Sequence, residues 1–194
     1  MEANKKTLRH KNLKKLLRTN PFSTDEELAS ILGVSVPTIR LDRATLGIPE
    51  LRARTKDMAI AAQNKLRSIG RKEIVGELLD LELNRSAISM MKVTSEMVSS
   101  KMETARGFYL YAMANTLALA VVDAEMVLTE VGNIKYKVPV EVGANLVAKA
   151  VVTKHRENRF FIFVCVKNDG EEVFRAKFIV VALDEENKEV RPGG

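Results

Sequence analysis

The sequence predicts an α+β protein in which a small helical N-terminal domain precedes an antiparallel sheet wrapped around one central helix. Apolar residues follow helical spacing as far as residue 70, and from Glu73 onward they alternate with polar ones. Residues 102–122 are apolar almost all round, which is typical of a helix surrounded by its own domain. Residues 1–76 carry a net charge of +8 and residues 77–194 a net charge of −2, so we expect the two parts to have different partners.

The composition excludes several classes of protein. The chain has 194 residues, of which 46% are hydrophobic and 29% charged, which is enough apolar material for a folded core. A single cysteine, Cys165, and two histidines, His10 and His155, supply neither a disulfide nor a zinc site, so we expect no metal and no cofactor. No secretory signal follows the basic N-terminus, and the apolar residues 108–122 are too few to cross a membrane. We expect a soluble, cytoplasmic protein with no membrane partner.

Two helices are predicted at the start of the chain. Residues 6–18 place leucines at helical spacing among many Lys and Arg, and Pro21 stops this basic helix because the residue before a proline is pushed out of the helical region. Thr24 and Glu27 have the spacing of a capping box, in which the two side chains bond the free amides at a helix start. A short second helix therefore begins near residue 25.

A tight turn at Gly33 separates this helix from a third one, whose first turn tolerates Pro37. Residues 27–40, ELASILGVSVPTIR, resemble the helix-turn-helix of many bacterial repressors, particularly the winged or DeoR-like kind. The resemblance implies that outward side chains of the third helix bond phosphates and base edges of DNA. The alternative is a helical hairpin whose arginines are merely solvated. On the first interpretation the DNA-contacting residues are Ser35, Pro37, Thr38, Arg40 and Arg43.

Arg52 and Arg54 come just after the third helix, where arginines can enter a narrow minor groove, and a solvated linker is the alternative. Residues 55–70 again have helical spacing, with an apolar stripe that must be buried on a second copy or on the following domain. We therefore expect a DNA-binding domain at residues 1–54 and an amphipathic linker helix at residues 55–72.

The remaining residues predict a sheet and its central helix at residues 73–186, followed by a flexible tail at residues 187–194. Asn168-Asp169-Gly170 has the composition of a tight hairpin turn. Besides the helix at 102–122, the extended segments expected from alternation are 79–84, 87–93, 134–141, 146–153, 159–166 and 172–183.

One buried helix followed by long antiparallel strands resembles the hot-dog fold of acyl-thioester enzymes and binding proteins. Together with the helix-turn-helix, the linker helix and ETARGF at residues 103–108, it resembles the FapR family of bacterial regulators of fatty acid and phospholipid synthesis. The resemblance covers the whole chain. It implies a homodimer that represses these genes by binding double-stranded operator DNA, and that is released when malonyl-CoA or malonyl-acyl carrier protein binds the hot-dog domain.

Arg106 stands near the N-terminal end of the predicted central helix, where its guanidinium, the free amides and the helix dipole favour a carboxylate such as that of a malonyl group. Gly107 leaves room for a ligand beside the helix, whereas Asn115, nine residues on, faces away and would reach a ligand held by Arg106 of the partner subunit. The resemblance adds Phe108 and Leu128 to the pocket. The alternative for Arg106 is a structural ion pair, and the alternative for Gly107 is a role in packing alone. For Asn115 it is a buried side chain bonded to a strand carbonyl.

The competing hypothesis is a hot-dog acyl-CoA thioesterase-like enzyme with an accessory DNA-binding domain. Such enzymes place an Asp, Glu or His where it can activate water or move a proton at the thioester. Here residues 106–109 occupy the region where a His-Gly-Gly type of turn is expected, and neither histidine is nearby in the sequence. Glu103 is the only carboxylate close to the helix start, where an acid also complements the helix dipole. We therefore expect no catalytic residues and no enzymatic activity.

Overall fold

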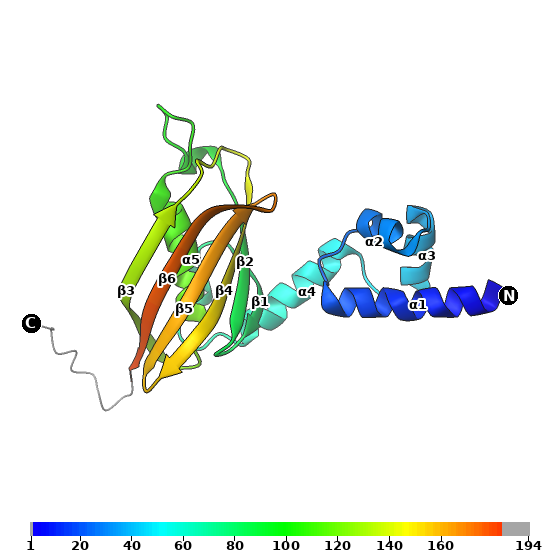
Figure 1. Cartoon of the computed structure of the whole chain (residues 1–194), viewed down its shortest axis with the longest axis horizontal. Helices are drawn as coiled ribbons and strands as arrows, with labels where there is room; N and C mark the ends of the chain where they lie inside the picture. Colours follow the sequence, from blue (N-terminus) through cyan, green and yellow to red (C-terminus); the bar gives the residue numbers. More distant parts are fainter. Residues whose placement is uncertain (1, 184–194) are drawn as a thin grey trace, which may run out of the picture. The chain divides into compact units, whose positions relative to one another are not determined.

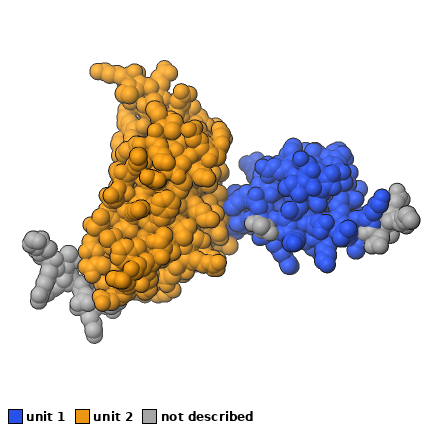
Figure 2. Space-filling model, viewed as in Figure 1, with its two compact units in different colours: residues 1–58 blue, residues 59–194 orange. Residues whose placement is uncertain are grey.

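The computed structural model describes residues 2–183, and it divides into two compact units, residues 1–58 and residues 59–194 (Figure 2). The predicted tail at 187–194, together with the last three residues of the predicted domain at 73–186, lies outside the described residues. The division falls within a helix, between Met58 and Ala59.

The N-terminal unit contains the predicted helix-turn-helix. Its helices are α1 (Glu2–Thr19), α2 (Asp25–Leu32), α3 (Val36–Thr45) and the beginning of α4 (Leu51–Asn64). The capping box is present, because Thr24 Oγ1 accepts from the Glu27 amide and Glu27 Oε2 accepts from the Thr24 amide. Gly33 ends α2 with a φ of 64°, which is the left-handed conformation that favours glycine. Local sequence signals therefore predicted both ends of α2.

A small apolar core holds these helices together. Leu13 of α1, Leu28 of α2 and Ile39 of α3 are fully buried, and Ala29 is nearly so. Leu16 and Leu17 pack against this cluster, while Lys11, Lys14 and Lys15 of the same helix are exposed. The apolar stripe of the basic first helix is thus explained by packing on the helix-turn-helix.

The linker helix was predicted at 55–72, but α4 begins at Leu51 and ends at Asn64. It begins early because the amide of Arg54 already donates to the carbonyl of Glu50, closing a helical turn over residues that were predicted to precede the linker helix. After Asn64 the amide of Lys65 donates to the carbonyl of Ala62, a tighter turn that ends the helix. Leu66 and Ile69 leave the helix and pack on the core of the C-terminal unit.

Six strands form one antiparallel sheet in the order β1-β2-β4-β5-β6-β3, and α5 (Gly107–Ala120) lies against one of its faces (Figure 1). The turn between β5 and β6 has positive φ at Asp169 and Gly170, as the hairpin motif predicted. The structure gives short 3₁₀ turns at Arg71–Glu73 and Ser95–Met97. The strands are β1 (Glu77–Glu82), β2 (Ser86–Lys92), β3 (Met126–Tyr136), β4 (Asn145–Arg156), β5 (Arg159–Asn168) and β6 (Glu171–Leu183).

The central helix is shorter than the predicted span of 102–122. The residues before it are extended, because Ala105 forms a bridge with Val98 and Thr104 forms one with Glu141. From Gly107 onward the helix is surrounded by its own domain as expected, since Met113 and Leu117 are fully buried. No described helix has the length and apolar character required to span a membrane.

The strand predicted at 134–141 overlaps the observed one only at residues 134–136, because β3 begins at Met126 and ends at Tyr136. β3 is an edge strand that pairs only with β6. Of its residues only Val127 is buried, and a register shift between Thr129 and Val131 interrupts the strand, so no continuous alternation marks its whole length in the sequence.

Candidate DNA-binding and effector-binding sites

The exposed face of α3 carries four of the predicted DNA-contacting residues. Ser35 is the N-cap, and its Oγ lies 2.9 Å from Thr38 Oγ1. Pro37 and Arg40 are exposed, and the side chain of Arg40 keeps 65% of its surface in solvent with its Nε 3.6 Å from Asp25 Oδ2. Donors for phosphates and base edges are therefore available on this face.

Arg43 was predicted to point outward, and this prediction is wrong. Its Nε and Nη2 donate to the two carboxylate oxygens of Asp25, each at 2.7 Å, and Nη1 donates to the carbonyl of Ile48. Arg43 is only 5% exposed. The paired guanidinium holds the pKa of Asp25 below its ordinary value. Arg43 thus joins α3 to the start of α2 and is not presented to DNA.

The sequence analysis missed a second buried ion pair on the inward face of α3. Asp42 accepts from Nε and Nη2 of Arg9 at 2.5 and 3.1 Å, and His10 Nε2 lies 2.9 Å from the same carboxylate. The bonds from Arg9 lower the pKa of Asp42. The signal was present in the spacing, since Asp42 and Arg43 lie three and four residues after buried Ile39.

The two arginines after α3 have different surroundings, although both were predicted to contact DNA. Arg54 donates to the carbonyls of Pro21, Ser23 and Pro49 at 2.6–3.2 Å, so it clamps α4 to two turns of the N-terminal unit. Neither predicted role, minor-groove contact or solvated linker, describes this arrangement. Arg52 is exposed in the first turn of α4. Of these two arginines, only Arg52 is exposed.

In the C-terminal unit, Arg106 was predicted near the N-terminal end of the central helix, and it is the N-cap residue of α5. Its side chain is exposed, and Nη1 donates to the carbonyl of Glu96 at 3.2 Å. Among the described residues no carboxylate forms an ion pair with Arg106. A cation with unused donors thus stands at the positive end of the central helix, an arrangement that attracts anions.

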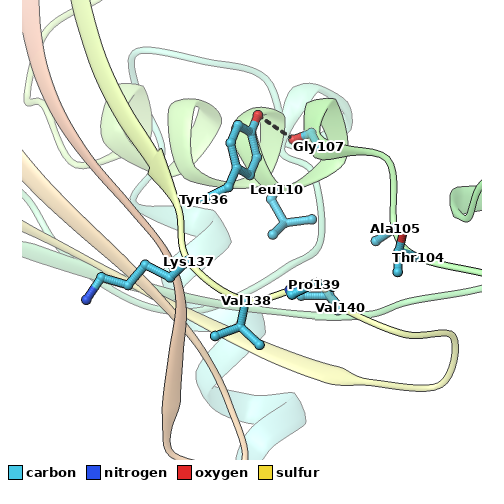
Figure 3. Close-up of a pocket in the computed structure, with 9 residues that line it drawn as sticks. All are labelled: Thr104, Ala105, Gly107, Leu110, Tyr136, Lys137, Val138, Pro139 and Val140. Atoms are coloured by element: carbon cyan, nitrogen blue, oxygen red, sulfur yellow. Dashed lines mark hydrogen bonds between the residues drawn. The ribbon is translucent and has the colours of Figure 1, made fainter. Parts of the chain in front are cut away.

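On one side of this position, a cavity of about 400 Å³ lies between the start of α5 and the end of β3. Tyr136 Oη donates to the carbonyl of Gly107 at 3.0 Å across it (Figure 3). A Cβ on residue 107 would lie 2.9 Å from the tyrosine ring, so Gly107 permits this close approach. The side chain of Lys137 points away from the other lining residues (Figure 3), toward Glu172, whose Oε1 is 2.8 Å from its Nζ.

A second cavity, of about 510 Å³, is lined by Phe108 and Tyr109 of α5 and by methionines of and near β2, and Arg106 itself lines neither cavity. Phe108 is 56% exposed. The structure therefore places Gly107 and Phe108, which are adjacent in sequence, in two different cavities.

Asn115 lies on another face of α5 from Arg106, as its spacing predicted. Its Nδ2 donates to Thr129 Oγ1 of β3 at 2.6 Å, so the asparagine joins the helix to the edge strand through a side chain and not through a strand carbonyl. Leu128, the neighbour of Thr129, is 49% exposed on β3. Within one chain the structure does not bring Asn115 and Leu128 into either cavity beside Arg106.

Groups suited to catalysis are sparse around the start of α5. Glu103 is exposed, with a φ of 54°. Burial raises the pKa of the Cys165 thiol, whose Sγ is 3.5 Å from Glu172 Oε2, so it is a poor nucleophile. Within residues 2–183 no three His, Cys, Asp or Glu side chains gather as a metal site would require.

The segment after α4 is attached to the other end of α5. Ser68 Oγ donates to the carbonyl of Leu119 in the last turn of α5, at 2.8 Å. Arg67 Nη1 donates to Asp123 Oδ1 at 2.8 Å, and Lys65 Nζ donates to the carbonyl of Leu81 at 3.0 Å. The same helix therefore carries Arg106 at its start and the attachment of the linker segment at its end.

Comparison with known proteins identifies the family. Residues 97–174 match the model of the Thioesterase superfamily, so the C-terminal unit is a hot-dog domain. Among solved structures, Cj0977, a sigma28-regulated virulence protein from Campylobacter jejuni, has a similar fold, with a TM-score of 0.61 and 20% identity over 66% of this chain and 92% of that one.

Two curated relatives, both named Transcription factor FapR, are similar along most of the chain. The protein of Thermoanaerobacter sp. (strain X514) is 51% identical over 181 residues, covering 93% of this chain and 90% of the relative. That of Bacillus subtilis (strain 168) is 42% identical over 181 residues, covering 92% and 96%. The chain therefore belongs to the FapR family of transcription factors.

Proposed function

We propose that this protein is a dimeric repressor of fatty acid and phospholipid synthesis genes, which binds operator DNA and is released by malonyl-CoA or malonyl-acyl carrier protein. The observation that carries the proposal is the position of Arg106, an exposed guanidinium at the N-cap of the central helix of a thioester-binding fold. The DNA-binding half rests on the exposed donors of α3 and on the net charge of +8 over residues 1–76.

The chemistry of the effector follows from Arg106. A malonyl thioester differs from an acetyl thioester by one carboxylate, and a guanidinium binds a carboxylate with two parallel hydrogen bonds. The helix dipole and the amides of the first turn add to this preference for an anion. Malonyl-CoA is therefore favoured over acetyl-CoA, whose methyl group offers Arg106 nothing to pair with.

A second copy is proposed to bind at the edge strand β3. Among the described residues β3 pairs on one side only, so its other edge presents free backbone donors and acceptors. Exposed apolar side chains line this strand of eleven residues, whereas the opposite edge strand β1 has six residues and begins and ends with a glutamate. The exposed large hydrophobic residues of β3 are Met126, Leu128, Val131, Ile134 and Tyr136.

Release of DNA requires that the effector favour a different state of the protein, and DNA then weakens effector binding by the same factor. The central helix offers a route, because Arg106 is at its start and the carbonyl that binds Ser68 is in its last turn. A shift of α5 on effector binding would move the segment that joins the hot-dog domain to α4.

The test is fluorescence anisotropy on promoter DNA of lipid-synthesis genes, with malonyl-CoA, acetyl-CoA and CoA titrated separately. Release by malonyl-CoA alone, lost in Arg106→Ala but with DNA binding intact, is the expected result. Release by malonyl-CoA, acetyl-CoA and CoA alike would contradict the role of the carboxylate. The absence of binding to any promoter would contradict the repressor itself.

The match to the Thioesterase superfamily favours a second candidate, a thioesterase with an accessory DNA-binding domain. We infer a sensor and no enzyme, because Glu103 is exposed and the Cys165 thiol is held protonated. Release of free thiol from malonyl-CoA, followed with a thiol reagent, separates the two. Sustained turnover that is lost in Glu103→Gln would establish the enzyme.

A further inference from the structure

The rotational setting of α3 about its own axis is fixed by two ion pairs on its inward face. Asp42 is bound by Arg9 of α1, and Arg43 is bound by Asp25 of α2. Rotation of α3 would break both pairs and expose Ile39, which is fully buried. The side of the helix that faces outward is therefore determined by contacts within the N-terminal unit.

Leu41 lies at the centre of that outward side. It is 64% exposed and, unlike Ile39, it takes no part in the apolar core of the N-terminal unit. Arg40 is adjacent and also exposed, and Thr38 lies one turn before. The one acid of α3, Asp42, is buried, so this surface carries no negative charge of its own.

We propose that Leu41 is a specificity-determining residue, which reads the methyl group of a thymine in the major groove of the operator. The inference rests on the proposed function. A recognition helix presents its outward side to base edges, and thymine is the base whose C5-methyl group offers an apolar contact there. A leucine supplies that contact and has no hydrogen bond to make, while neighbouring Arg40 can donate to a guanine or a phosphate.

DNA fits this surface better than another protein does. An exposed leucine next to an arginine, on a unit with excess positive charge, matches a polyanion whose groove displays methyl groups. If this surface binds another protein and not DNA, Leu41→Ala will leave DNA binding unchanged. The experiment below therefore separates the two kinds of partner.

The experiment combines a protein variant with a chemical change in the DNA. Full-length protein first selects its operator from random duplexes, and each thymine of that operator is then replaced singly by deoxyuridine, which removes only the methyl group. Affinities are measured for the wild type and for Leu41→Ala. Ile31→Ala is the matched control, because Ile31 of α2 is similarly exposed, at 61%.

For at least one thymine in each half-site, removal of the methyl group is expected to weaken the wild type by about three- to tenfold, as burial of one methyl group implies. The same change should weaken Leu41→Ala by less than about twofold, while Ile31→Ala behaves as the wild type does. Equal effects on the wild type and Leu41→Ala at every thymine would overturn the role of Leu41 alone. Failure of the wild type to select any duplex would overturn the proposed function with it.

Discussion

Asp42 of α3 accepts a hydrogen bond from Nε of Arg9 of α1 at 2.5 Å, and only 1% of the Asp42 side chain is exposed. A carboxylate thus lies on the buried face of the helix that carries most of the predicted DNA-contacting residues. With Arg43 and Asp25 it sets which side chains of α3 face outward. Charged residues in this unit therefore divide into those that hold the helices together and those that remain exposed on the surface.

Asp42→Asn is expected to destabilise the N-terminal unit by about 2 to 3 kcal/mol at pH 7, because a charge-assisted bond to Arg9 is lost. The pKa of Asp42 is lowered in the folded state, so its contribution is complete above the unfolded value of about 4 and is lost as the pH falls through the lower folded value. Urea unfolding at pH 7, 5 and 3 measures this. The difference in the free energy of unfolding between wild type and Asp42→Asn should shrink only at pH 3. The control Asp57→Asn changes an exposed residue and should leave the free energy of unfolding unchanged at every pH.

Arg40→Ala is expected to impair DNA binding but not stability, and Arg43→Ala is expected to impair stability. Arg40 is exposed, so its loss should weaken operator binding about tenfold and leave the melting temperature unchanged. Arg43 is buried against Asp25, so its loss should lower the stability of the fold by about 3 kcal/mol. Thermal unfolding and anisotropy, measured on both variants, decide this. A stable Arg43→Ala with impaired DNA binding would restore the outward role first predicted for it.

Gly107→Ala is expected to displace the ring of Tyr136, because the new Cβ would lie 2.9 Å from ring carbons. The cost should be about 1 to 2 kcal/mol, since an exposed ring can move although its bond to the Gly107 carbonyl is lost. Combining the change with Tyr136→Ala removes the clash. The double variant should therefore be no less stable than Tyr136→Ala alone, and additive losses would show that the glycine serves another purpose.

Val131→Lys is expected to convert the proposed dimer to a monomer, because a charge would be placed on the apolar edge strand β3. Sedimentation equilibrium measures the change. Val147→Lys is the control, since Val147 is similarly exposed but lies on β4 inside the sheet. A dimer that survives the first change would place the interface elsewhere.

Features with local signals were predicted from the sequence, and those created by contacts between distant residues were not. The capping box at Thr24 and the hairpin turn at Asp169 depend on neighbours a few residues away, and both were confirmed. Arg43 was assigned to the surface because it is charged, while its partner Asp25 lies eighteen residues earlier.

The sheet and the effector site show the same division. The edge strand β3 was misplaced because a register shift between Thr129 and Val131 breaks its alternation, so only its last residues carry the pattern of a strand. The position of Arg106 at a helix start was predicted to within a few residues, since it depended only on where the apolar run begins. The contact between Gly107 and Tyr136 joins residues twenty-nine apart and had no signal in the sequence.

The central claim is that Arg106 recognises the carboxylate of the effector, and isothermal calorimetry of malonyl-CoA and acetyl-CoA tests it most directly. The wild type should bind malonyl-CoA at least about tenfold more tightly than acetyl-CoA, a difference of about 1.4 kcal/mol. Arg106→Ala should lose this preference while keeping whatever affinity it has for acetyl-CoA. An Arg106→Ala protein that still prefers malonyl-CoA to the same degree would contradict the claim.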